Sequence, residues 1–356
     1  KLSKTAPPSL SDKDMQLGDW AGDWRETSVA AFYQGFWCPL WNDTAISRGE
    51  GGQQSTRFSC FDAQPPVPFR QWLPHRHRPC AHTTLSDLLP ANQTLFAVGD
   101  SVSGQHMKTL VCRLLMEAGP GGQVEFDARP WFSRIVNPKA VHYERREPSC
   151  VRISDAKRSS RRVCYVGCSP SCVVTIGAMA SHRVAVPGDL LVINEGLLLP
   201  ENRSVFHASV LAHEFASTTS TIGTAAASGV RKIWREQSPQ TFGGAPDGSY
   251  AHQGQAASAY SSRGNGAGCG PLAQPFPRPA ALRLLDHIRG SGMPIVPTFD
   301  VTHTQWDVYL ASRTAWVRTK LDCTHFCEPS GVLEAWTDRL LCVAPPARAL
   351  DVSGGG

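Results

Sequence analysis

The chain has 356 residues, of which 41% are hydrophobic and 18% are charged, and its formal net charge is +5. This balance excludes a disordered, collagen-like or coiled-coil protein and fits one or two globular domains. No apolar run approaches the roughly 20 residues that a membrane span needs. Because the chain begins at Lys1 and shows no signal-like stretch, we expect a targeting segment or membrane anchor, where the protein has one, to lie outside it.

Residues 1–90 are rich in Pro, Trp and Cys and contain no long periodic segment. Frequent prolines of this kind are typical of irregular structure. We therefore expect an irregular, Cys-rich N-terminal segment that wraps around the rest of the chain. An α/β catalytic domain at 91–345 and a tail at 346–356 would follow it.

From residue 94 onward, short apolar runs alternate with helical patterns. The runs predict strands at 95–98, 190–193, 230–234 and 294–299, and the patterns predict helices at 107–116, 205–215 and 280–288. Alternation of this kind predicts a mostly parallel sheet with helices on both faces, which is a three-layer α/β fold.

Two stretches interrupt the alternation. The basic stretch 129–162 favours a solvated insertion over a docking surface for an acidic glycan. The Gly-rich stretch 243–270 predicts a long flexible loop.

Twelve cysteines are spread along the whole chain. Cys164, Cys168 and Cys172 recur every four residues but lack a fourth ligand in zinc-like spacing, so we expect disulfides and no metal. Disulfides indicate an oxidising compartment. Glycosylation sequons begin at Asn42, Asn92 and Asn202 and favour the same secretory environment.

The first candidate for chemistry is Gly99-Asp100-Ser101, which follows the predicted strand 95–98. A serine there stands at the start of a helix and at the carboxyl edge of a parallel sheet, where such folds keep their sites. The free N–H groups of the helix end would stabilise an oxyanion. Taken alone, the motif suits a helix-capping serine equally well.

A serine nucleophile needs a base, and the base needs a carboxylate to orient it. An Asp-x-x-His pattern supplies both groups, and this chain has two. They are Asp300-x-x-His303 and Asp322-x-x-His325. Spacing does not choose between them.

The surroundings of the second pair resemble the trichome birefringence-like family of plant and algal polysaccharide O-acetyltransferases, whose PC-esterase domain is akin to SGNH/GDSL hydrolases. The family carries a GDS motif early and a D-C-x-H-W-C-x-P segment late, as Gly99–Ser101 and Asp322–Pro329 do here. Other segments follow the family's order and spacing, so that the resemblance covers most of residues 18–343. They are Trp37–Pro39, Trp72–Cys80, Asn194–Gly196, Trp234–Gln240 and, as a late V-D-V-T strand, Phe299–Thr302.

The resemblance implies an SGNH/GDSL-like sheet and a catalytic triad in which Ser101 is the nucleophile, His325 the base and Asp322 its orienting partner. Gly99 and Asp100 would form the nucleophile turn. The Ser101 N–H and the Asn194 amide would hold the oxyanion. The family has an arginine three residues after its serine, where this chain has Gly104. We expect either a low activity or a substitute donor such as Gln105 or His106.

The implied activity is transfer of an acetyl group, through acetyl-Ser101, to sugar hydroxyls of a cell-wall polysaccharide in the Golgi lumen or outside the cell. No bound cofactor is implied; acetyl-CoA or an acetylated carrier would be a co-substrate, and the partner would be a polysaccharide, not a nucleic acid. Two alternatives are a carbohydrate acetylesterase with the same triad and a catalytically weak glycan-binding protein.

The resemblance also implies three disulfides, Cys38–Cys112, Cys60–Cys327 and Cys269–Cys323, of which the last two flank His325. It leaves six cysteines unassigned, to pair among themselves or to stay free. They are Cys80, Cys150, Cys164, Cys168, Cys172 and Cys342.

Overall fold

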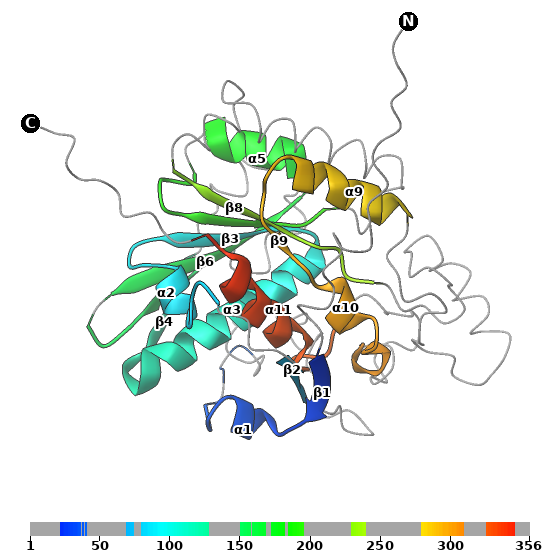
Figure 1. Ribbon diagram of the computed structural model, residues 1–356. Coiled ribbons are helices and arrows are strands. Elements are labelled where there is room, and N and C mark those ends of the chain that lie inside the picture. Colours follow the sequence, from blue (N-terminus) through cyan, green and yellow to red (C-terminus); the bar gives the residue numbers. More distant parts are fainter. Residues whose placement is uncertain are drawn as a thin grey trace, which may run out of the picture.

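The computed structural model describes the sheet, its main helices and part of the N-terminal segment (Figure 1). The described residues are 22–36, 38, 40, 69–74, 80–127, 150–157, 159–168, 172–181, 184–195, 229–239, 279–309 and 325–345.

Seven strands form one mixed sheet in the order β4-β5-β6-β3-β7-β8-β9. Their bounds are β3 (Thr94–Gly99), β4 (Gln123–Asp127), β5 (Cys150–Ser154), β6 (Ser160–Gly167), β7 (Leu190–Ile193), β8 (Arg231–Arg235) and β9 (Ile295–Val296). Strands β6, β3, β7, β8 and β9 pair in parallel, whereas β5 is antiparallel to both β4 and β6. The prediction of a mostly parallel α/β sheet is confirmed.

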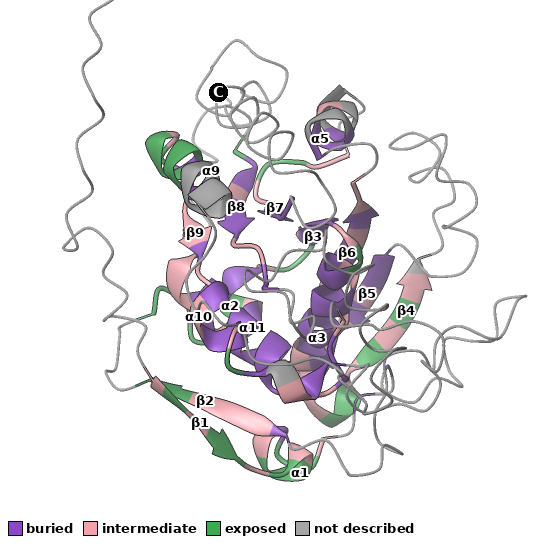
Figure 2. Cartoon of the chain, turned by 90° about the vertical axis from the view of Figure 1, so that its right-hand side faces the viewer, coloured by how far each residue is buried: buried purple, intermediate pink, exposed green. Residues whose placement is uncertain are grey.

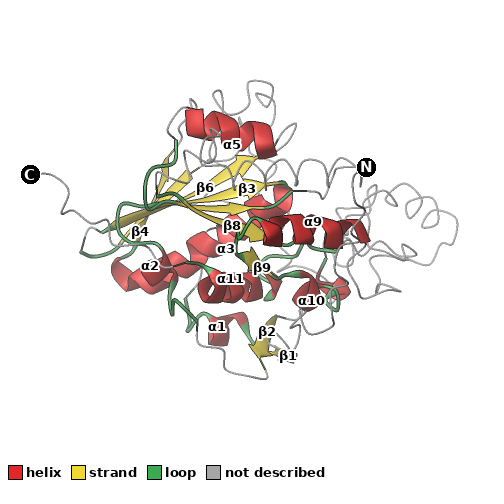
Figure 3. Cartoon of the chain, turned by 45° about the horizontal axis from the view of Figure 1, so that its top comes forward, coloured by secondary structure: helices red, strands yellow, loops and turns green. Residues whose placement is uncertain are grey.

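Helices cover both faces of this sheet, as Figures 1 and 3 show. One face carries α5 (Cys172–Ser181) and α9 (Pro279–Gly290), and the other carries α2 (Leu85–Leu88), α3 (Ser101–Ala118) and α11 (Val332–Val343). The short helix α10 (Phe299–Thr302) and 3₁₀ turns at Gly119–Gly121 and Trp306–Val308 complete the described helices.

Alternation along the central strands explains the two layers, because successive side chains of a strand point to opposite faces. Leu95 and Ala97 of β3 pack in the core beneath α3, whereas Phe96 and Val98 pack in the second core with α5 and α9. The whole of β3 is buried. This two-sided burial is typical of a central parallel strand.

Most predicted elements of the described chain are present with shifted ends, and two interpretations are wrong. The segment Phe299–Thr302 is helix α10 and not a late strand, because β9 ends at Val296 and Glu236 accepts hydrogen bonds from the Thr298 and Phe299 N–H groups. The stretch 129–162 is not only a solvated insertion, since β5 and the start of β6 lie in it. The predicted helix 205–215, the loop 243–270 and the tail 346–356 lie outside the described residues.

The described part of the N-terminal segment consists of a small two-stranded sheet, β1 (Gly22–Glu26) with β2 (Arg70–Pro74), and the helix α1 (Val29–Phe32). Figure 2 shows these elements as mostly exposed or intermediate beside a buried sheet. Side chains bind them to the α/β body: Trp24 Nε1 donates to Val301 O at 3.1 Å, and the buried Tyr33 hydroxyl donates to Glu334 at 2.7 Å. The segment therefore packs against the α/β body.

The described residues hold four complete disulfides, Cys38–Cys112, Cys80–Cys342, Cys150–Cys164 and Cys168–Cys172. The first is the pair that the resemblance implies. The other three pair the six unassigned cysteines among themselves. Cys327 is also disulfide-bonded, to a residue outside the described ones, where Cys60, Cys269 and Cys323 lie. This disulfide content is compatible with a secreted or lumenal protein.

Candidate active site

Ser101 is the first residue of α3 and follows directly on the turn that ends β3. Asp100 is the N-cap, and its carboxylate accepts from the N–H groups of Val102 and Ser103 at 3.0 and 3.3 Å. Among the described residues no group accepts from the Ser101 N–H, which leaves it at the helix tip for an oxyanion. The Ser101 side chain is exposed and open to a substrate.

Gly99 makes this turn sterically feasible. A Cβ atom at this position would lie 2.3 Å from Ser103 Oγ and 2.7 Å from the Asn194 carbonyl oxygen. The strand end therefore accepts only glycine without displacement of its neighbours. Each residue of the Gly-Asp-Ser sequence thus has its own local role: Gly99 avoids a steric clash, Asp100 caps α3, and Ser101 carries the exposed hydroxyl.

His325 lies beside this serine. Its Nε2 atom is 2.6 Å from Ser101 Oγ, although the two residues are 224 positions apart in the chain. This distance suits a hydroxyl that donates to an unprotonated imidazole nitrogen, which is the starting geometry of a serine nucleophile and its base. Asp322, the expected orienting residue, lies outside the described residues.

The alternative pair has a different role. The Asp300 carboxylate is held by the Arg339 guanidinium, with Nη2 donating to Oδ2 at 2.9 Å and Nη1 donating to Oδ1. His303 stacks on the Phe299 ring at a centroid distance of 5.8 Å. Asp300 therefore fixes α10 to α11. The structure brings His325, and not His303, to the serine.

The segment that carries His325 is fixed to α3 by a side chain one turn after Ser101. Gln105, which is 1% exposed, donates through Nε2 to the Phe326 carbonyl at 2.9 Å and accepts through Oε1 from the Phe326 N–H at 3.1 Å. About one turn further along α3, the Lys108 Nζ atom lies 3.8 Å from the Glu328 Oε2 atom. The same helix thus positions both the serine and the histidine.

The two expected substitutes for the missing arginine donor are engaged elsewhere. Gln105 is committed to Phe326, and the buried His106 makes its hydrogen bond with Thr337 at 3.2 Å. Burial lowers the pKa of His106 well below its ordinary value, with the Arg235 charge acting in the same direction, so its ring is neutral. Neither side chain points to an oxyanion at Ser101, and that expectation is wrong.

The expected oxyanion role of Asn194 also conflicts with the structure. Asn194 is 2% exposed, and its Nδ2 atom donates to the carbonyls of Arg235 and Glu236 at 3.0 and 3.3 Å. Both amide hydrogens are thereby used. Asn194 follows β7 directly and joins its end to the end of β8.

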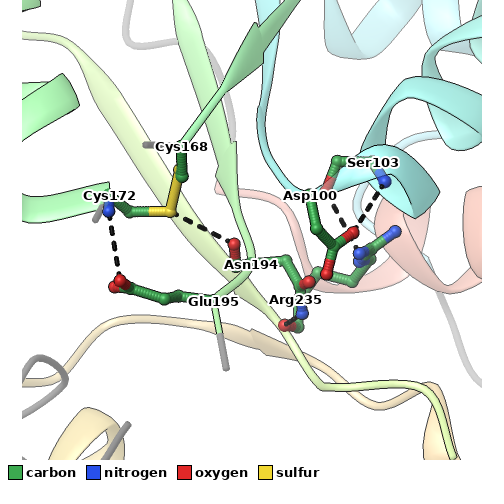
Figure 4. The surroundings of a disulfide bond; sticks show 7 residues. All are labelled: Asp100, Ser103, Cys168, Cys172, Asn194, Glu195 and Arg235. Carbon is green, nitrogen blue, oxygen red and sulfur yellow. Dashed lines mark hydrogen bonds between the residues drawn. A yellow bond between two sulfur atoms is a disulfide. The ribbon is translucent and has the colours of Figure 1, made fainter. Parts of the chain in front are cut away.

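A disulfide lies on the other side of Asn194 (Figure 4). Cys172, bonded to Cys168, has its sulfur 3.3 Å from the Asn194 carbonyl oxygen, and its N–H donates to Glu195 at 3.1 Å. A disulfide sulfur has no hydrogen to donate, so the first of these is a packing contact. These contacts connect the carboxyl end of β6 to the carboxyl end of β7.

Arg235 is the residue of the site whose importance the sequence analysis missed. It ends β8 with its side chain 1% exposed and on the α3 side of the sheet, whereas Trp234 faces the other layer. Its Nη2 donates to Ser103 Oγ at 3.2 Å, and its guanidinium lies 4.7 Å from the centre of the Trp336 ring. Because β8 reads Arg-Lys-Ile-Trp-Arg, with basic residues at both ends, no local sequence signal singled out Arg235.

Within the described part of the chain, no cluster of three or more His, Cys, Asp or Glu side chains is arranged to hold a metal ion. Of the helices described, none is long and apolar enough to cross a membrane. Comparison of the chain with family models, with curated proteins and with solved structures finds no match.

Proposed function

We propose that this protein is an O-acetyltransferase that moves an acetyl group through Ser101 to hydroxyls of a polysaccharide in the Golgi lumen or outside the cell. The observation that carries the proposal is the 2.6 Å distance between Ser101 Oγ and His325 Nε2 at the carboxyl edge of a parallel sheet. The choice of acetyl group and glycan comes from the family resemblance of the sequence motifs.

In the proposed reaction, Ser101 Oγ attacks the acetyl carbon of the donor while His325 Nε2 takes the hydroxyl proton. The carbonyl oxygen becomes an oxyanion, which the Ser101 N–H stabilises at the tip of α3. The donor's leaving group departs with the proton from His325, and acetyl-Ser101 remains. A sugar hydroxyl then loses its proton to His325 and attacks the acetyl carbon. The bond from the acetyl carbon to Ser101 Oγ breaks, and Oγ takes the proton from His325, which restores the free serine.

The exposure of Ser101 supports a large acceptor. Its side chain is exposed, and the groups that position it are buried beneath it. A polysaccharide chain reaches such a serine without entering the protein. Water also reaches it, so a carbohydrate acetylesterase with the same residues is the competing outcome.

The test uses a labelled acetyl donor, a panel of glycans and mass spectrometry of the protein and of the glycans. We expect acetyl-Ser101 and acetylated glycan with the wild type and neither product with Ser101→Ala. Ser86→Ala is the matched control, because the Ser86 hydroxyl donates to Glu117 at the opposite end of α3 from Ser101. Absence of any adduct from the wild type would overturn the proposal. Release of acetate without acetylated glycan would show that the protein is an acetylesterase and not a transferase.

A further inference from the structure

The amino end of α3 holds a buried pair of opposite charges. Asp100 caps the helix with its Oδ1 atom, whereas its buried Oδ2 atom has no hydrogen-bond partner among the described residues. Across from it, the Nε and Nη1 atoms of Arg235 are equally buried and likewise have no partner in the described part of the chain. The two groups therefore interact through their charges and not through a hydrogen bond. Figure 4 shows both side chains converging beneath Ser103.

The charge of Asp100 is not needed for its capping role, because asparagine caps helices about as well as aspartate. In a site for acyl transfer the charge is unfavourable. The oxyanion that forms when Ser101 is attacked would meet a second negative charge close by, in surroundings that screen it poorly.

The pKa values of the two groups depend on each other. Burial lowers the pKa of Arg235 to about 10, with Asp100 opposing the change, so the guanidinium stays protonated. Burial raises the pKa of Asp100, and the Arg235 charge opposes this most strongly. Each charge thus favours the ionised form of the other.

Arg235 is also the point at which the elements of the site meet. Its carbonyl accepts from Asn194 at the end of β7, its Nη2 binds Ser103 on α3, and its guanidinium covers Trp336 on α11, the helix that follows the His325 segment. These three contacts hold Arg235 in place.

We propose that Arg235 is a positioning residue for acyl transfer at Ser101, where it neutralises the buried Asp100 carboxylate beneath the nucleophile. The inference rests on the proposed function, since it presumes that Ser101 is acylated. It predicts that removal of the Arg235 charge slows acylation of Ser101 chiefly because the negative charge of Asp100 remains.

The experiment measures the rate at which a fluorophosphonate labels Ser101, followed by mass spectrometry. The Ser101 oxygen forms a bond to phosphorus, fluoride leaves, and the hydroxyl proton passes to His325, so that no natural substrate is required. The variants are Arg235→Met, Asp100→Asn, the double variant and Arg235→Lys. Arg231→Met is the matched control, because Arg231 is a buried arginine at the opposite end of β8 that binds the carbonyls of Leu88 and Gly188.

We expect Arg235→Met to slow labelling by about 10²-fold, in the range typical of one lost electrostatic partner of an oxyanion. The double variant should recover to within about tenfold of Asp100→Asn, and Arg235→Lys should lose less than about tenfold. With p-nitrophenyl acetate, the loss in Arg235→Met should fall on kcat and leave KM unchanged. Arg231→Met should lower the midpoint of thermal unfolding without slowing labelling of the folded protein.

Labelling of Arg235→Met at the wild-type rate, or a double variant as slow as Arg235→Met, would overturn the inference. If Arg235→Met does not fold, the double variant and Arg235→Lys decide: recovery of folding in the double variant supports charge coupling, and a folded Arg235→Lys slowed more than 100-fold contradicts it. Failure of the wild type to label at Ser101 would overturn the proposed function instead. In that case, the midpoints of thermal unfolding of the four variants test the charge coupling between Asp100 and Arg235 independently of labelling.

Discussion

The side-chain amide of Gln105 pairs with the backbone of Phe326 through one donated and one accepted hydrogen bond. Because Phe326 follows His325 directly and Gln105 lies one helical turn after Ser101, this contact sets the distance between nucleophile and base. We expect Gln105→Met to leave two buried backbone groups unsatisfied, at a cost of about 1–3 kcal/mol each, and to slow fluorophosphonate labelling of Ser101. Gln123→Met, at an exposed position of the edge strand β4, is the control. Unchanged labelling in folded Gln105→Met would refute the positioning role.

The choice of histidine gives a second prediction. His325→Ala should abolish labelling of Ser101 by the probe, because no other described imidazole reaches its hydroxyl. His303→Ala should retain labelling, since its ring only stacks on Phe299. Labelling rates of the two purified variants, checked for folding by circular dichroism, decide the matter. Loss of activity confined to His303→Ala would reverse the assignment.

A third prediction concerns pH and the contact between the N-terminal segment and α11. Burial raises the pKa of Glu334 to about 7 from an ordinary 4.5, so the folded protein binds a proton there that the unfolded chain has lost. Stability from this group is therefore full below pH 4.5 and is lost as the pH rises to about 7. The loss amounts to about 3 kcal/mol at 1.36 kcal/mol per pKa unit.

The measurement is the free energy of unfolding of the wild type and of Glu334→Gln between pH 4 and 8. The difference between the two should change between about pH 4.5 and 7 and stay constant above that range. Tyr33→Phe, which removes the hydroxyl that donates to Glu334, should lower stability and extend the pH dependence to higher pH, because this hydrogen bond lowers the pKa of Glu334. A pH-independent difference between wild type and Glu334→Gln would disprove the assignment.

The disulfides differ in the length of chain that they close. Cys80–Cys342 joins residues 262 positions apart, and Cys150–Cys164 joins residues 14 apart. In the chain-entropy model, loops of these lengths are worth about 6 and about 3 kcal/mol. We expect Cys80→Ser with Cys342→Ser to lower the free energy of unfolding more than Cys150→Ser with Cys164→Ser. Denaturant titration of both double variants tests the order, and equal losses would contradict it.

Local sequence was sufficient for several parts of this protein. The apolar runs predicted β3 and β7, because strands buried on both faces are continuous in hydrophobicity. The Gly-Asp-Ser motif predicted the strand-to-helix turn, since the end of the strand, the close approach at Gly99 and the Asp100 cap are all determined by neighbouring residues. The strands β5 and β6 were missed because their arginines resemble a solvated stretch. Their neighbours in the sheet, which the local pattern does not contain, decide their state.

Only the tertiary structure decided which groups meet at the serine. Two Asp-x-x-His patterns were equal in spacing, and only the motif resemblance favoured His325. The contacts that bring His325 to the serine are tertiary: Arg339 binds Asp300, and Gln105 holds the segment of His325. The roles of Asn194 and Arg235 likewise depend on strand ends that are distant in sequence. Hydrogen bonds and charges act over a few ångströms in space, and a partner 40 or 220 residues away leaves no mark on the local pattern. Length, composition and the twelve cysteines therefore determined the class of the protein, whereas contacts between distant segments determined its candidate site.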